Sequence, residues 1–224
     1  MYTRVLRLAQ PVILVTTPVG AFKWYVDELI SQEFVLGTYE PYMQRAFLTY
    51  VKSGYVVFDV GAHAGFHTLF CALLVGPKGQ VIAFEPCPLN RRTIERQRKF
   101  NADLPITVLP YALSDRCGTL TMNTSMGSSQ AYVSQTGDLT VESRTIDALV
   151  SQGIVPLPQA IKLDVEGHEA QVLAGAVQTL RRYKPVVLCD YNDDTTLREV
   201  EELLVPLGYA VLPGPPITAV PAEN

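Results

Sequence analysis

The sequence predicts an α/β fold: a mostly parallel sheet with helices on both faces. Short apolar runs alternate along the chain with stretches of helical period, which is typical of βαβ units. One apolar strand ends on Asp59 and is followed by a glycine turn, Gly61 to Gly65, and then by a helical stretch. A second apolar run, Val81–Phe84, ends on Glu85. This layout is typical of a nucleotide-type site at the carboxyl ends of parallel strands.

Length and composition are consistent with this fold class. A chain of 224 residues with 48% hydrophobic and 18% charged residues fits one globular domain with a sizeable core. The formal net charge is −4 and no long basic block occurs, so electrostatic capture of nucleic acid or of an anionic membrane is not indicated. The four cysteines are scattered and form no C-x-x-C pair. This usage is compatible with the reducing cytoplasm, where we expect the protein to act.

The two ends of the chain differ from its middle. Residues 1–23 are moderately apolar, but prolines interrupt them and no run reaches membrane-spanning length. We therefore expect no membrane span, and a structured N-terminal extension that forms a strand or an interface arm. An interface arm would suit a homodimer. The C-terminal segment Pro213–Asn224 contains four prolines and is expected to be irregular.

The elements of the middle follow in order. Strands are predicted where apolar runs end at polar or turn residues: Tyr55–Asp59, Gly79–Phe84, Ile106–Pro110, Ala160–Leu163, Val186–Asp190 and Tyr209–Leu212. Helices are predicted where the period is helical or a proline opens the first turn: Pro41–Lys52, Ala64–Val75, Pro88–Asn101, His168–Tyr183 and Thr196–Leu204. Added strands are expected near Thr119–Asn123 and Leu139–Ser143. Between them, residues 124–138 are rich in Ser, Gly and Gln, which indicates a surface loop or a substrate-facing flap.

The glycine spacing distinguishes between possible nucleotides. The turn reads G-A-H-A-G, without the third glycine of a dinucleotide turn and without the lysine of a P-loop. The carboxylate of Asp59 before the turn is a poor neighbour for a pyrophosphate and a good one for a cation. S-adenosylmethionine (SAM) carries an ammonium and a sulfonium and has no phosphate, so it fits this turn. The alternative is a Rossmann-like domain in which the turn is only tight and Asp59 only caps a helix.

A second group of acids follows the strand Ala160–Leu163. The segment A-I-K-L-D-V-E-G-H places Asp164 at the strand end, Glu166 two residues later, and Gly167 at the entry to the next helix. Because ligands bind at the carboxyl ends of strands in open α/β sheets, these acids and the earlier strand-end acids are expected to share one site. The alternative for Glu166 is a helix start, where the macrodipole favours an acid whatever the function.

All three histidines lie in or beside these two loops. Each of His63, His67 and His168 could act as a general base near neutral pH, or could pack against a ligand or cap a helix. His63 and His67 are four residues apart, a spacing that suits a metal only if both are helical. The glutamate of an H-E-x-x-H motif is missing and His63 falls in the turn, so no metal site is expected.

These residues resemble the FkbM family of SAM-dependent methyltransferases. The matching segments are LGTYEP (Leu36–Pro41), VVFDVGAHAGFHTL (Val56–Leu69), VIAFEPCPLN (Val81–Asn90), PYALSD (Pro110–Asp115) and IKLDVEGHEAQVLAGA (Ile161–Ala176). The resemblance implies a Rossmann-like class I methyltransferase fold, with seven strands and an antiparallel last hairpin. It covers residues 34–212, which we take as the methyltransferase domain between an extension (1–33) and a Pro-rich tail (213–224).

The resemblance also implies the roles of individual residues. SAM would be held by Tyr39, Glu40, Asp59, Gly61, His63, Gly65, Glu85, Pro86, Ala112, Ser114, Asp115 and Asp164, with Glu85 on the ribose hydroxyls and Ala112 beside the adenine. Asp164, Glu166 and His168 would face the transferred methyl group, with His168 as the first choice for the base and His67 as the alternative. The sequence departs from the family pattern at His63 and at the CDYN that ends the fifth strand.

The predicted function is therefore SAM-dependent methyl transfer, with S-adenosylhomocysteine (SAH) as the product. The expected acceptor atom is a hydroxyl oxygen of a small-molecule, sugar or polyketide-type acceptor, or of a glycan. Two other functions stay open. An NAD-dependent oxidoreductase would require the G-x-G-x-x-G turn, which is absent. The other is a non-catalytic SAM-binding module, against which the intact acids argue and which turnover on a panel of acceptors would separate from an enzyme.

Overall fold

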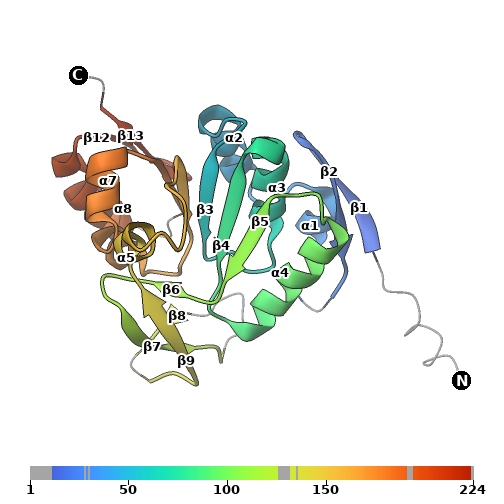
Figure 1. Cartoon of the computed structure of the whole chain (residues 1–224), viewed down its shortest axis with the longest axis horizontal. Helices are drawn as coiled ribbons and strands as arrows, with labels where there is room; N and C mark the ends of the chain where they lie inside the picture. Colours follow the sequence, from blue (N-terminus) through green and yellow to red (C-terminus); the bar gives the residue numbers. More distant parts are fainter. Residues whose placement is uncertain are drawn as a thin grey trace, which may run out of the picture.

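The main feature of the fold is a seven-stranded sheet with the strand order β12-β13-β11-β10-β3-β4-β5 (Figure 1). The structure is a computed structural model that describes residues 12–27, 29, 31–125, 132–134, 136–190 and 194–222. In the sheet, β13 pairs antiparallel with both of its neighbours, and the remaining pairs are parallel. The α/β class and the seven strands are confirmed.

The strands of this sheet are short and end in the loops that form the site. Their bounds are β3 (Val56–Val60), β4 (Gln80–Phe84), β5 (Ile106–Leu109), β10 (Ala160–Leu163), β11 (Val186–Cys189), β12 (Tyr209–Leu212) and β13 (Ile217–Pro221). The register is continuous across the centre, where Asp59 pairs with Lys162 on one side and with Ala83 on the other. The loops after β3, β4, β10 and β11 therefore leave the sheet at the same edge.

Helices cover both faces of the sheet because side chains alternate along the strands. The helices are α1 (Gln32–Leu36), α2 (Pro41–Tyr50), α3 (Phe66–Val75), α4 (Pro88–Phe100), α5 (Ile146–Ser151), α6 (Glu169–Ala174), α7 (Val177–Tyr183) and α8 (Asp194–Leu204). On β3, Val57 belongs to the core under α2 and α3, and Phe58 belongs to the core under α5 to α8. None of the described helices is long and apolar enough to cross a membrane.

A second, smaller sheet lies below the main one in Figure 1. It has the order β6-β9-β7-β8, with β6 (Ala112–Leu113), β7 (Gly118–Asn123), β8 (Tyr132–Val133) and β9 (Leu139–Arg144). β7 and β9 confirm the two added strands. β8 lies within the stretch predicted to be a loop or flap, and residues 126–131 and 135 of that stretch lie outside the described residues.

The described part of the N-terminal extension is a hairpin of β1 (Val12–Thr17) and β2 (Gly20–Tyr25) that packs into the core. Trp24 is fully buried, with its ring centroid 5.1 Å from that of Phe34 and 6.2 Å from that of Phe66. The buried amide of Gln97 on α4 donates to the Tyr25 carbonyl and accepts from the Tyr25 N–H, at 2.9 and 2.7 Å. The hairpin thus supports α3 and α4, the two helices that begin at the predicted site.

Two predictions for the C-terminal half are wrong. The segment Pro213–Asn224 is not irregular, because Ile217–Pro221 forms strand β13, with Ile217 and Ala219 fully buried. Its prolines stand before the strand and at its last residue, where a missing N–H does not interrupt the ladder. The single helix predicted over His168–Tyr183 is broken between α6 and α7. A Cβ on Gly175 would lie 1.9 Å from the Ser114 carbonyl oxygen, and this close contact explains the break.

The packing of the hairpin predicts a stability difference. Trp24→Ala should lower the free energy of unfolding by about 3–5 kcal/mol, because it removes a buried indole from an aromatic cluster. Leu14→Ala on the same hairpin should change it by less than about 0.5 kcal/mol, because Leu14 is 68% exposed. Urea denaturation of both variants measures this difference. Equal effects would mean that the hairpin is not part of the cooperative core.

Candidate functional site

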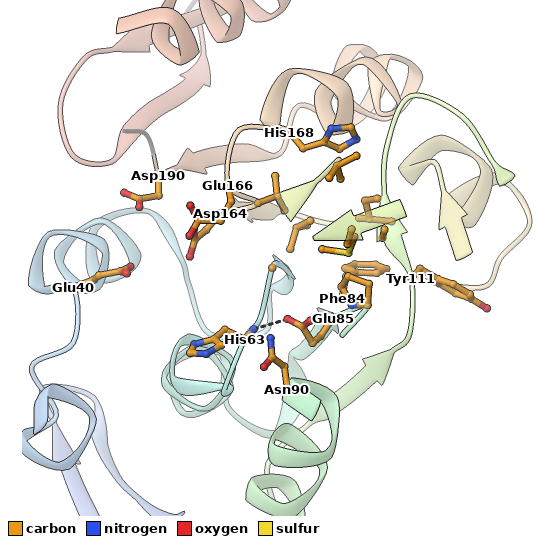
Figure 2. Close-up of a pocket in the computed structure, with 18 of the residues that line it drawn as sticks. Glu40, His63, Phe84, Glu85, Asn90, Tyr111, Asp164, Glu166, His168 and Asp190 are labelled. Carbon is orange, nitrogen blue, oxygen red and sulfur yellow. Dashed lines mark hydrogen bonds between the residues drawn. The ribbon is translucent and has the colours of Figure 1, made fainter. Parts of the chain in front are cut away.

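A cleft of about 890 Å³, including its open mouth, lies at the carboxyl ends of the central strands. It is lined by Tyr39, Glu40, Val60, Gly61, His63, Phe84, Glu85, Pro86, Asn90, Tyr111, Ala112, Leu113, Met122, Val133, Asp164, Val165, Glu166, His168 and Asp190. Figure 2 shows a group of acids on one side of the cleft, and Glu85 with the aromatic rings of Phe84 and Tyr111 on the other. The loops after four strands and the small sheet all contribute to the cleft, as expected for a site at this edge.

The predicted glycine turn is required by the backbone geometry. Gly61 has φ +78°, and a Cβ there would lie 1.8 Å from the Asp164 carbonyl oxygen, so only glycine allows the β3 and β10 loops to approach. The N–H groups of Gly61 and Ala62 both donate to the Phe84 carbonyl, at 3.1 and 3.2 Å. Gly65 has φ +89° and begins α3. Gly61 lines the cleft, and Gly65 supports the turn from beneath, against Ile94.

Glu85 is a buried carboxylate that both faces the cleft and holds its loops. Its side chain is 4% exposed. Oε2 accepts from the His63 N–H and Oε1 accepts from the Cys87 N–H, each at 2.8 Å (Figure 2). Burial raises the pKa of Glu85 to about 7, against the lowering effect of these N–H donors. The Asn90 side chain also bonds to this carboxylate and lowers its pKa, and Glu85 lines the cleft, where it can accept from a hydroxyl donor.

Lys162 on β10 lies beneath the cleft and joins three loops. Its ammonium is 3.2 Å from Asp59 Oδ1 and 3.2 Å from Asp164 Oδ2, and it donates to the Gly61 carbonyl at 2.8 Å. Burial lowers the pKa of Lys162, but the charges of Asp59 and Asp164 more than offset this, and the net shift is upward. Lys162 is thus a buried cation that is paired with two carboxylates and donates one hydrogen bond to a main-chain carbonyl.

Asp59 lies below the cleft rather than in its wall. It is 1% exposed, is not among the residues lining the cleft, and accepts a hydrogen bond from Thr68 Oγ1 at 2.5 Å. Its predicted influence on a cationic ligand can therefore act only through Lys162 and the Gly61 turn. Asp164 differs, because it pairs with the same ammonium while its side chain lines the cleft.

Four acids from four loops form one side of the cleft, which we call the acidic wall: Glu40, Asp164, Glu166 and Asp190 (Figure 2). Glu166 is exposed at the rim, and burial together with the charge of Asp164 raises its pKa. Asp190 follows β11 and faces Tyr42, whose pKa is raised by burial and by Glu40 and Asp190. The positive charge of Lys162 partly counteracts the raised pKa of Glu40 and of Glu166.

The opposite end of the cleft is apolar. Phe84, Leu113, Met122 and Val133 line it, together with Ala112 and Tyr111. Behind them, Ser114 is 1% exposed and donates to Asp115 Oδ1 at 3.0 Å. The predicted residues Ser114 and Asp115 therefore support this end without lining it, while Ala112 and Pro86 line it as predicted.

The structure places the two histidines predicted as bases differently, because one lines the cleft and the other is buried 3.7 Å from Glu40 Oε2. His168 lines the cleft, but its Nε2 is 2.9 Å from Ser114 Oγ, on the side of the small sheet. His67 is 4% exposed and packs between Tyr39 and Phe47, with ring centroids 5.3 and 5.4 Å away. Burial, and then the charge of Lys162, lowers the pKa of His67 to about 3, so this ring is neutral near pH 7. The ring does not line the cleft.

His63, the third histidine, does reach the cleft. Its backbone has φ 49°, and its Nε2 is buried without a hydrogen-bond partner among the described residues. Burial lowers its pKa, so the neutral ring is available as a donor or acceptor for a ligand. Within the described ranges, no three His, Cys, Asp or Glu side chains are grouped so that they could hold a metal ion.

Several residues that line or support the cleft were not assigned from the sequence: Asn90, Tyr111, Met122, Val133, Lys162 and Asp190. Lys162 had a usable signal, because a lysine inside a fully apolar strand next to a strand-end acid indicates a buried ion pair. Met122 and Val133 had none, since they reach the cleft through the arrangement of the small sheet.

The chain is similar in sequence to known methyltransferases. The model of the family described as "Methyltransferase FkbM domain" matches residues 59–211. Hexuronic acid methyltransferase AglP of Haloferax volcanii is 31% identical over 169 residues, which cover 74% of this chain and 64% of that protein. 2-O-methyltransferase NoeI of Sinorhizobium fredii is 26% identical over 165 residues, covering 62% of this chain and 63% of that protein. The chain thus spans less than two thirds of the length of either relative.

A solved structure gives the same fold. The crystal structure of methyltransferase FkbM from Methylobacillus flagellatus KT superposes with a TM-score of 0.54 at 17% identity, over 85% of this chain and 55% of that one. This likeness, together with a further solved SAM-dependent O-methyltransferase from Thermotoga maritima (TM-score 0.52, 15% identity, 99% and 82% coverage), places the chain in the class I methyltransferase fold.

The Lys162 contacts predict a large effect on folding stability. Lys162→Met leaves Asp59 and Asp164 without their shared cation and should lower the free energy of unfolding by about 3–5 kcal/mol. The double variant Lys162→Met/Asp59→Asn should recover part of that loss, because it removes the fully buried carboxylate as well. Urea denaturation at neutral pH tests both. A Lys162→Met protein as stable as the wild type would show that the ammonium is not essential to the cleft floor.

Proposed function

The chain belongs to the FkbM methyltransferase family, and from this premise we propose that it transfers a methyl group from SAM to a hydroxyl oxygen of a sugar-type acceptor. The observation that carries the proposal is the buried Glu85 carboxylate, which faces the cleft beside the Gly61 turn and opposite the acidic wall. This arrangement suits a ligand with a ribose at one position and positive charge at another.

The residues present fit SAM as the cofactor. Glu85 has lone pairs for two ribose hydroxyls, and the apolar end around Ala112, Leu113 and Met122 suits an adenine ring. His63 Nε2, which is buried without a described partner, offers a further polar contact. The wall opposite Glu85 carries carboxylates, which favour an ammonium or a sulfonium and disfavour a pyrophosphate. When bound, SAM supplies a methyl group on a positively charged sulfur.

The protein's own contribution is positioning and charge. Glu85 and the adjacent Gly61 turn would hold the ligand together, and the main-chain carbonyl of Gly61 is fixed by Lys162. Tyr39, whose ring packs on Phe34 with centroids 4.6 Å apart, would cover the ligand from the N-terminal side. Positioning of two reactants in a fixed geometry is a large part of what such a transfer requires.

The acceptor class is proposed from the relatives and the wall together. One relative is named for hexuronic acid and the other for a 2-O position, which supports a sugar-type acceptor and an oxygen atom. Carboxylates such as Asp164 and Asp190 are good acceptors for sugar hydroxyls. The NAD-dependent oxidoreductase lacks support, because the turn has no third glycine and the family is one of methyltransferases.

The Glu85 assignment predicts a loss of cofactor affinity. Glu85→Ala should weaken SAH binding by about 1.5–3 kcal/mol, the range for hydrogen bonds to a charged group. Isothermal titration calorimetry with SAH measures this, and NAD serves as the negative ligand. Glu95→Ala is the matched control, because Glu95 lies on α4, the helix that follows Glu85, and does not line the cleft. Unchanged SAH affinity in a folded Glu85→Ala protein would remove Glu85 from the site.

Turnover separates an enzyme from a binding module. Incubation with methyl-labelled SAM and a panel of neutral glycosides and uronic acids should transfer label to at least one sugar. Treatment of the product with mild alkali distinguishes a methyl ether, which survives, from a methyl ester, which is hydrolysed. An alkali-stable product supports a hydroxyl acceptor, and an alkali-labile one would contradict it. SAM binding without transfer to any sugar-type acceptor would favour the non-catalytic module.

A further inference from the structure

Glu40 is held in a backbone conformation that its sequence position disfavours. It has φ 43° and ψ 68°, in the left-handed region, although it precedes Pro41, where extended backbone is preferred. It occupies the N-cap position of α2 but makes no capping hydrogen bond with its side chain. Local helix chemistry therefore does not explain a glutamate here. Strain of this kind, held by the surrounding fold, is a reason to look for a function of the side chain.

A buried amide holds this conformation. Gln44 is 4% exposed, and its side-chain amide donates to the carbonyls of Gly37 and Tyr39 at 3.0 and 2.8 Å. The Gln44 N–H also donates to the Glu40 carbonyl at 3.1 Å. These bonds fix the chain on both sides of Glu40, so its side chain is directed into the cleft rather than into solvent.

The Glu40 carboxylate lacks a hydrogen-bond donor at one oxygen. The side chain is 15% exposed, and the buried Oε2 has no hydrogen-bond partner among the described residues. The nearest cationic candidate is His67 Nε2 at 3.7 Å, too far for a hydrogen bond, and that ring is neutral near pH 7. A buried oxygen without a donor is costly. The carboxyl group also bonds to the Tyr39 side chain and lines the cleft.

The groups around Glu40 set its charge near neutral pH. Tyr39 flanks it, Tyr42 and His67 face it from α2 and α3, and Asp164, Lys162 and Asp190 face it from the ends of β10 and β11. Burial, followed by the negative charge of Asp164, raises the pKa of Glu40 to about 7. A carboxylate that titrates near working pH can accept a proton and release it again to solvent.

The other candidates for a base on this side are paired, buried away from the cleft or, in the case of Glu166, exposed at the rim. Asp164 pairs with Lys162 at 3.2 Å, and Asp190 interacts with Tyr42. His168 is bonded to Ser114 on the side of the small sheet, and His67 is buried behind Tyr39. Glu40 is the member of the acidic wall that combines burial, an unpartnered oxygen and a position lining the cleft.

We propose that Glu40 is the general base of the reaction, the group that takes the proton from the acceptor hydroxyl. This inference rests on the proposed function. The hydroxyl O–H bond breaks and its proton passes to the Glu40 carboxylate, while the acceptor oxygen forms a bond to the methyl carbon. The carbon–sulfur bond breaks and its electron pair stays on sulfur, which loses its positive charge. Glu40 then returns the proton to solvent through the open mouth of the cleft.

The first test needs no acceptor. SAM and SAH differ at the sulfur, where SAM alone is positive, so the ratio of their affinities reports negative charge near the reacting centre. In the wild type, this ratio should shift towards SAM by on the order of tenfold as the pH rises from 5.5 to 8.5, because Glu40 ionises near the middle of that range. Effects on the parts common to both ligands, including Glu85 at the ribose, cancel in the ratio.

The variants make the test specific. In Glu40→Gln, both ligands should still bind and the ratio should no longer change with pH. Glu33→Gln, an exposed glutamate seven positions earlier on α1, should keep the wild-type pH dependence. A flat ratio in the wild type, or an unchanged pH dependence in Glu40→Gln, overturns the role of Glu40 alone. If the wild type binds neither SAM nor SAH, the proposed function fails and this inference with it.

Folding stability gives a second readout, which reports the ionisation of Glu40 without any ligand. A carboxyl whose folded pKa lies above its unfolded value makes the fold less stable as the pH rises from about 4.5 through 7. Glu40→Gln should therefore gain stability relative to the wild type as pH rises across this range, which urea denaturation measures. Once a labelled acceptor is identified, Glu40→Gln should lower kcat at saturating SAM by roughly 10²- to 10⁴-fold, beyond the loss of SAM affinity, on the order of tenfold, expected from the missing charge. Near-wild-type kcat in Glu40→Gln would exclude Glu40 as the base.

Discussion

The geometry of the cleft depends on the ammonium of Lys162. The two loops that form the floor of the site, after β3 and after β10, both contact this ammonium. Asp59 reaches it from one strand and Asp164 from the other, and the Gly61 carbonyl supplies the third acceptor. The buried carboxylate of Asp59 and the partly exposed one of Asp164 would repel each other without this cation. The ion pairs contribute geometry more than stability, because burying the charges offsets much of their attraction.

The same contact explains why glycine is needed at position 61. Because Lys162 draws the Gly61 carbonyl and the Asp164 side chain to one point, the two backbones approach until a Cβ on Gly61 would overlap the Asp164 carbonyl. In this turn, the N–H groups of Gly61 and Ala62 donate to the Phe84 carbonyl, and these bonds connect the turn to β4 and to Glu85. A substitution of Lys162 is therefore expected to alter the position of Glu85, although Lys162 is on β10 and Glu85 follows β4.

Features of the fold and the cleft that depend on residues close together in the sequence could be predicted from it. Features that depend on contacts between distant residues could not. The parallel sheet, the glycine turn and Glu85 were predictable, because apolar period, φ > 0 and strand-end acids are local signals. The strand Ile217–Pro221 was missed because prolines flank it, and the break at Gly175 was missed because its cause is the distant Ser114 carbonyl. The bond between His168 and Ser114 likewise joins residues 54 positions apart, so the sequence did not indicate which side of the cleft His168 would take.

Strained backbone gathers at the cleft, and buried side chains hold it there. Among the described residues, four that are not glycine have positive φ, and three of them line the cleft: Glu40, His63 and Glu166. Each conformation costs on the order of 1–3 kcal/mol and persists only if its surroundings require it.

The three strained residues share one kind of support. Beside Glu40, the amide of Gln44 donates to the carbonyls that precede it. Beside His63, the Glu85 carboxylate accepts the His63 N–H, and around Glu166, Glu169 Oε1 accepts the N–H groups of the residues before and after it. Gln44, Glu85 and Glu169 are each 4–5% exposed. Because these supports are buried within the fold, the cleft-facing side chains are positioned before any ligand arrives, and binding need not supply that part of the ordering free energy.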